Sequence, residues 1–123
     1  MKVSLRMIRK DLLTNEEEVL LETEALLNGN RLLYRESSDA RQCVTFGSDI
    51  VLERHSDVTS RTVLKPHERG LSTIDSQYGT MEIETELVSF YRNDNEWMAE
   101  YRLLSGKEVI LHQRIVWQIA LQN

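Results

Sequence analysis

The sequence predicts an all-β fold of about eight to ten antiparallel strands, arranged as a closed meander barrel or a sandwich. Apolar and polar residues alternate along much of the chain, and compact turns rich in Asn, Asp and Gly separate the alternating runs. Because successive side chains of a strand point to opposite faces, such alternation indicates strands with one buried face. The 123 residues are 41% hydrophobic, which is enough for a core, and we expect one domain over residues 1–123.

The alternating runs follow one another from the first residues to the last. They are Val3–Met7, Cys43–Phe46, Ile50–His55, Thr80–Tyr91, Trp97–Leu103 and a long closing run in which Val109, Leu111, Ile115, Trp117, Ile119 and Leu121 share one parity. The turn signals between runs are Asn28-Gly29, Gly47-Ser48-Asp49, Arg92-Asn93-Asp94-Asn95 and Ser105-Gly106-Lys107. Asn, Asp and Gly tolerate the positive φ angles of tight hairpin turns, so these signals favour short connections between neighbouring strands.

Residues 15–27 fit two structures. Thr14 and Glu17 have the spacing of a helix capping box, and apolar residues then recur at helical spacing as far as Asn28-Gly29. In a strand, Val19, Leu21, Thr23, Ala25 and Leu27 would share a face, with Leu20 and Leu26 on the other. The local pattern leaves both readings open and slightly favours the helix.

Charge, cysteine content and hydropathy narrow the setting. The formal net charge is −5, whereas proteins that bind nucleic-acid backbones usually carry a basic surplus, so we expect no nucleic-acid partner. No apolar run approaches the length of a membrane span, so we expect no membrane partner. A single cysteine and a start without an apolar leader region favour the cytoplasm.

Several segments resemble the YwiB-like proteins, a family of small uncharacterised bacterial proteins. The resembling segments are Leu52-Glu53-Arg54-His55, Ser60–Leu64, Leu71-Ser72-Thr73, Tyr78-Gly79 and Met81–Thr85, with the opening strand and the long closing strand. None of these motifs is a catalytic signature, and their order and spacing carry the resemblance. It implies a calycin- or lipocalin-like barrel and a hairpin over residues 16–36 around Asn28-Gly29-Asn30. We therefore expect a strand at residues 18–27, against the local helical pattern.

The residues that usually carry catalysis or metal binding show no pattern. His55, His67 and His112 lie far apart in the chain, and no short metal-binding motif is present. Cys43 is better explained as a small buried side chain than as a nucleophile, and Gly-rich phosphate loops are absent. We expect no enzyme activity, no cofactor and no metal.

Polar residues with inward parity are the candidate ligand-binding residues. Arg54 shares a face with Ile50 and Leu52, Thr85 lies between inward apolar residues, and so does Gln113. A buried guanidinium is costly unless it is paired, so Arg54 either reaches water or a carboxylate at the barrel mouth, or offers donors to an anionic ligand. We predict Arg54, Thr85, Gln113 and Tyr78 as the tentative ligand-binding set, with Gly79 as a turn residue.

The leading hypothesis is a small-ligand-binding barrel for an anionic or amphipathic molecule. The alternative is a protein–protein interaction module or homodimer with a filled, inert barrel. Val88 and Phe90 share the parity of the outward glutamates, and with Leu20 and Leu26 they would provide its apolar patch.

Overall fold

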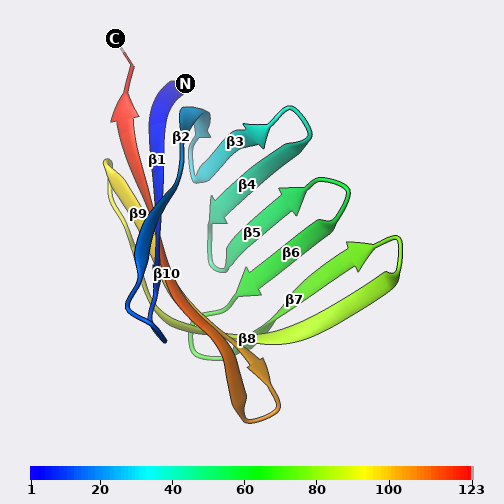
Figure 1. The fold of residues 1–123 in the computed structure, drawn as a ribbon. Helices are drawn as coiled ribbons and strands as arrows, with labels where there is room; N and C mark the ends of the chain where they lie inside the picture. Colours follow the sequence, from blue (N-terminus) through cyan, green and yellow to red (C-terminus); the bar gives the residue numbers. More distant parts are fainter. Residues whose placement is uncertain (123) are drawn as a thin grey trace.

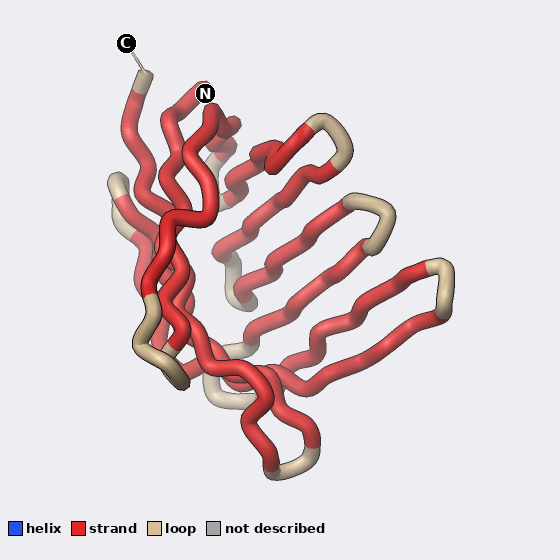
Figure 2. Tube along the Cα trace, viewed as in Figure 1, coloured by secondary structure: helices blue, strands red, loops and turns tan. Residues whose placement is uncertain are grey.

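The structure, a computed structural model, describes residues 1–122 and contains ten strands (Figure 2). They are β1 (Lys2–Asp11), β2 (Glu17–Asn28), β3 (Arg31–Ser37), β4 (Ala40–Phe46), β5 (Ile50–His55), β6 (Thr59–Leu64), β7 (Arg69–Ser76), β8 (Gly79–Arg92), β9 (Glu96–Ser105) and β10 (Glu108–Leu121). Strands and turns account for the described chain, which has no helix long and apolar enough to cross a membrane.

The strands form a closed antiparallel meander barrel, which confirms the predicted fold class. Each strand pairs with its neighbours in sequence, and β1 closes the barrel by pairing with β10 along Val3–Asp11. The hairpins β3–β4, β5–β6 and β7–β8 run across the long strands β1, β2, β9 and β10 at a steep angle (Figure 1). The inner faces of these two groups of strands pack against each other and enclose the core.

Residues 17–28 are a strand, so the hairpin expected around Asn28-Gly29-Asn30 is confirmed and the helical reading is wrong. Asn28 pairs with Arg31 across a two-residue turn, and Gly29 has φ of 62°. A positive φ suits glycine, which has no Cβ to clash with the backbone. The nine residue pairs between β2 and β1 outweigh a local propensity for helix.

Residues 1–122 contain four β-bulges that reverse side-chain parity, and three of them correct parts of the sequence interpretation. The shift at Leu20 places Val19 opposite Ile8 on the outer face instead of beside Leu21. The shift at Val88 places Phe90 opposite the inner residue Ala99, although Phe90 is still 49% exposed, as expected. The shift at Ile110 places Val109 opposite Leu104 on the outer face. A bulge adds one residue to one strand, so strict alternation fails beyond it.

Aromatic side chains fill the middle of the barrel. Trp97 and Trp117 are 2% and 1% exposed, and both pack against Phe46, at ring-centroid distances of 5.1 Å and 5.9 Å. Aromatic pairs at such tilted and edge-on geometries add to the free energy of burial. Arg92 lies over Trp97 and donates to the carbonyl of Gly29, so it covers one end of the barrel.

Candidate functional site

The other end of the barrel contains a cavity of about 280 Å³. Its lining is Met7, Arg9, Leu20, Gln42, Val44, Leu52, Glu53, Arg54, Ser60, Thr62, Tyr101, Gln113, Ile115 and Trp117. Phe46, Trp97 and Trp117 form what we call the aromatic centre. Trp117 also lines the cavity, so the aromatic centre forms the floor of the cavity. We call this cavity and its lining the mouth cavity.

The register of the short hairpins explains why polar residues meet there. Tyr34 lies opposite Gln42, Gln42 opposite Arg54, and Arg54 opposite Ser60, so one row of inward side chains crosses four strands. The next row towards the centre, which includes Val44 and Leu52, is mostly apolar. The barrel lining therefore changes from apolar to polar within one step along the strands.

Arg54 is held at the mouth by a carboxylate. Its Nε donates to Oε1 of Glu36 at 2.7 Å, one terminal nitrogen donates to Oε2 at 3.1 Å, and the other donates to Ser56 at 3.2 Å. This bidentate pair lowers the pKa of Glu36, because the hydrogen bond from Arg54 outweighs the effect of partial burial, and it raises the pKa of Arg54. Both terminal nitrogens keep one further N–H donor.

A chain of hydrogen bonds connects this ion pair to the aromatic centre. The indole Nε1 of Trp117 donates to the hydroxyl of Tyr34 at 3.1 Å, and that hydroxyl donates to Oε1 of Gln42 at 2.5 Å. The amide of Gln42 donates in turn to Glu36. Burial is the main cause that raises the pKa of Tyr34, so its hydroxyl stays protonated and available as a donor.

The long strands supply the opposite wall of the cavity. The amide of Gln113 donates to the hydroxyl of Tyr101 at 2.6 Å, and burial raises the pKa of that hydroxyl. Arg9 pairs with Glu18 at 2.6 Å through a terminal nitrogen. Its Nε is buried and has no hydrogen-bond partner within residues 1–122, which leaves an unsatisfied donor at the cavity.

The structure brings together two of the four predicted site residues. Arg54 and Gln113 both line the mouth cavity. Thr85 is completely buried elsewhere, where its hydroxyl donates to the carbonyl of Val63 at 2.7 Å and joins β8 to β6. Tyr78 is 90% exposed at the tip of the β7–β8 hairpin, beside Gly79 with its φ of 121°.

Sequence reasoning missed Glu36, Gln42, Tyr101 and Arg9. Gln42 alternates with Val44 and could have been found by extending the short run at Cys43–Phe46 towards its start. Glu36 lies in a bulge between β3 and β4, where the register shifts between Arg35 and Ser37. No sequence pattern announces that bulge, so the carboxylate partner of Arg54 had no local signal.

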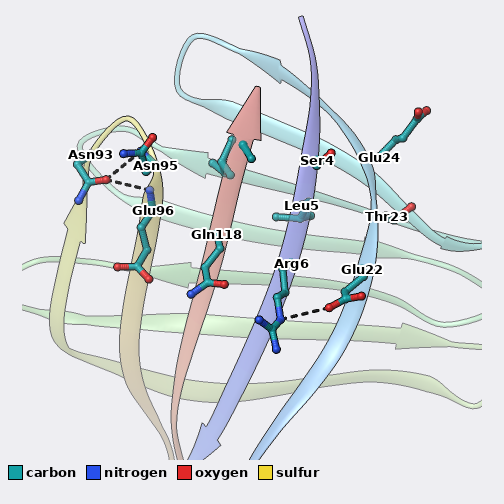
Figure 3. A pocket seen from close by; sticks show the side chains of 12 residues that line it. Ser4, Leu5, Arg6, Glu22, Thr23, Glu24, Asn93, Asn95, Glu96 and Gln118 are labelled. Atoms are coloured by element: carbon teal, nitrogen blue, oxygen red, sulfur yellow. Dashed lines mark hydrogen bonds and ion pairs between the residues drawn. The ribbon is translucent and has the colours of Figure 1, made fainter. Parts of the chain in front are cut away.

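A larger hollow, of about 840 Å³, lies on the outside of the barrel (Figure 3). Its floor is the outer face of β1 and β10, and the β8–β9 turn with Asn93 and Asn95 forms one rim. Arg6 pairs with Glu22 across it at 3.2 Å. The hollow opens widely to solvent, so the smaller mouth cavity is the better candidate for a small-molecule site.

The histidines and the buried Glu100 lie away from the mouth cavity. On the outer face, Glu100 accepts from Arg114 at 2.9 Å and contacts His112 at 3.1 Å. Burial would raise the pKa of Glu100, but these two hydrogen bonds together lower it. His55 and His67 lie on other elements, and within residues 1–122 no group of His, Cys, Asp or Glu is arranged to hold a metal ion.

The fold and its mouth define a closed ten-stranded meander barrel of the calycin-like class, filled at the centre and polar at one end. The chain belongs to the family described as a domain of unknown function, DUF1934, whose model matches residues 4–116. The crystal structure of the ywiB protein from Bacillus subtilis is similar, with 12% sequence identity and a TM-score of 0.62 over 98% of this chain and 91% of that one. The resemblance to YwiB-like proteins is thus confirmed as a likeness of family and fold. Comparison with functionally curated proteins gives no match.

Proposed function

We propose that this protein is a cytoplasmic, non-enzymatic binding module whose mouth cavity holds a small amphipathic anion. The cavity carries this proposal, because it sets apolar walls beside two arginine side chains. Met7, Val44 and Leu52 offer a surface for a short apolar chain, and Arg9 and Arg54 offer donors for its acidic group. Ligand pockets commonly combine apolar walls with a few such polar groups.

The free donors favour a carboxylate as the acidic group. Arg54 keeps unpaired N–H groups beside Glu36, and the buried Nε of Arg9 has no partner within the described residues. A guanidinium matches the two oxygens of a carboxylate, so an incoming acid gains hydrogen bonds that the empty cavity leaves unmade. At about 280 Å³ the cavity is slightly below the usual range for drug-sized ligands, which points to a small molecule.

Titration with hexanoate, followed by the indole N–H signals in the NMR spectrum, tests the proposal. Trp117 lines the cavity whereas Trp97 lies towards the other end, so the Trp117 signal is expected to shift and the Trp97 signal to stay. Arg54→Gln is expected to weaken binding about tenfold or more, and Arg61→Gln, on the exposed face of β6, to leave it unchanged. Equal shifts with hexanol would contradict recognition of an acid, and no saturable shift with either compound would refute the proposal.

The alternative function is an interaction module, which exposed apolar side chains support. Val19, Leu20 and Leu26 on β2 are each more than 40% exposed, as is Val88 on β8. The three β2 residues lie on one strand, and exposed apolar groups close together are typical of interaction sites. A concentration-dependent dimer in sedimentation velocity, lost on Leu26→Ser, which lies outside the mouth cavity, would favour this function over ligand binding.

A further inference from the structure

Most of strand β2 has a hydrogen-bonded neighbour on one side only. Its pairing with β1 extends from Glu17 to Leu26, but its pairing with β3 covers only Ala25–Asn28. Figure 1 shows β2 and β3 diverging from their shared turn. The segment Glu17–Glu24 is therefore an open sheet edge within the barrel wall, and we call it the β2 edge.

The hydrogen bonds at the end of β2 show which backbone groups face this edge. The amide of Leu27 donates to the carbonyl of Met1 at 2.8 Å, and the amino group of Met1 donates back to Leu27 at 3.1 Å. In an antiparallel pair such bonds recur at every second residue, so Thr23 and Ala25 also bond towards β1. The N–H and C=O groups of Glu22 and Glu24 therefore point away from β1, towards the open side.

A hollow of about 540 Å³ lies where β2 and β3 separate. Its lining combines outer-face residues such as Glu24 and Arg35 with inner-face residues such as Tyr34 and Gln42. Residues from both faces of a sheet line one hollow only where the sheet is split. The β2 edge thus begins at a slot in the barrel wall, lined by residues of both faces.

We propose that the β2 edge binds an extended basic segment of another protein as an additional strand. Unpaired strand edges are templates for such addition, in which backbone hydrogen bonds give affinity and side chains give selectivity. Four of the eight residues of the β2 edge are glutamates: Glu17, Glu18, Glu22 and Glu24. Arg9 and Arg6 pair with Glu18 and Glu22, which leaves the carboxylates of Glu17 and Glu24 without an ion pair among residues 1–122.

A second copy of the chain fits this edge poorly. In an antiparallel pair of two β2 edges centred on Leu20, Glu18 of one copy would lie opposite Glu22 of the other. Like charges directly opposite each other destabilise a strand pair. A segment with outward lysines or arginines and inward apolar residues relieves this repulsion. The end of the partner segment that lies at the slot should be neutral or acidic, because Arg35 and Arg41 line the far side of the hollow.

Amide hydrogen exchange with a short synthetic peptide of alternating Lys and Val tests the proposal. Glu22 and Glu24 are expected to exchange rapidly in the free protein and to gain at least about tenfold protection with the peptide, because their N–H groups become hydrogen-bonded. Thr23, already bonded to β1, is the internal control. The matched peptide of alternating Glu and Val should protect neither residue. Equal protection by both peptides, or protection by neither, would overturn the proposal.

Variants separate the backbone contribution from that of the side chain. Glu22→Pro removes the N–H that faces the open edge, whereas Glu22→Ala removes only the carboxylate. We expect Glu22→Pro to weaken binding of the Lys–Val peptide more than Glu22→Ala does. Arg54→Gln should leave this binding unchanged, so failure of the mouth-cavity proposal and failure of this one can be told apart. Protection of Glu22 that grows with protein concentration alone would show self-association and refute the basic partner.

Discussion

The aromatic centre and the mouth cavity share the same strands but differ in chemistry. In the centre, Trp97 and Trp117 are almost completely buried against Phe46. At the mouth, the side chain of Arg54 is 43% exposed and its charge is neutralised by Glu36. Burial of large apolar surfaces dominates folding free energy, whereas partly exposed ion pairs contribute little to it. The centre therefore accounts for most of the stability, and the proposed function places ligand recognition at the mouth.

Truncation in the centre should have the largest effect. Trp97→Ala removes a ring that is 2% exposed and is expected to lower the free energy of unfolding by about 3–5 kcal/mol. Urea unfolding followed by circular dichroism measures it. Leu52→Ala, a truncation at the half-buried mouth, should cost less. If the two variants lose the same stability, the distinction between centre and mouth fails.

Gly70→Ala should have the next largest effect, because Gly70 on β7 lies against the hydrogen bond that joins Thr85 on β8 to Val63 on β6. A Cβ at this position would overlap the carbonyl oxygen of Val63 and come within 2.7 Å of Oγ1 of Thr85. We expect a loss of about 1–3 kcal/mol in thermal or urea unfolding. Gly47→Ala is the control, since a Cβ there meets only ordinary contacts. A harmless Gly70→Ala would mean that Thr85 does not join β8 to β6 as described.

Tyr34→Phe tests the hydrogen-bonded connection between the two regions. It removes the hydroxyl that accepts from Trp117 and donates to Gln42, and it leaves the buried indole N–H unpaired. Unfolding free energy should fall by about 1–3 kcal/mol. Tyr78→Phe, at a 90% exposed position, should change nothing. Similar stability of both variants would show that the chain from centre to mouth has no energetic role.

Glu36→Gln should have the smallest effect on stability, and that effect should depend on pH. The folded-state pKa of Glu36 lies below its ordinary value of 4.5, so its ionised form stabilises the fold above that pH. The advantage of the wild type over Glu36→Gln, about 0–1 kcal/mol at neutral pH, should disappear as pH falls through the folded-state pKa. The free energy of unfolding of both proteins, measured from neutral pH to below the folded-state pKa of Glu36, checks the direction of this change. An advantage that grows on acidification would contradict the Glu36–Arg54 ion pair.

Alternation and turn signals were sufficient to predict an antiparallel all-β fold, and the resemblance to YwiB-like proteins favoured the barrel over the sandwich. They failed locally where bulges occur, so the faces of Val19, Phe90 and Val109 were misassigned. Arg54 and Gln113 were predicted as inward polar residues because both lie within regular alternation.

The remaining features of the site depend on tertiary structure. Thr85 has the same inward parity as Arg54, yet its hydroxyl bonds a backbone carbonyl that only the folded β6 brings near. Glu36 meets Arg54 across β4 through a bulge that sequence does not reveal. The split between β2 and β3 likewise arises from the different directions of two strands.

Native mass spectrometry of the protein, purified gently from cells, tests the central claim most directly. If the mouth cavity holds a small acid, the wild type should retain a small-molecule adduct that Arg61→Gln keeps and Arg54→Gln loses. The dissociated adduct should contain an acidic group and fit a cavity of about 280 Å³. Bare protein mass for all three, together with no binding of added hexanoate, would contradict the claim that the barrel mouth is a ligand site.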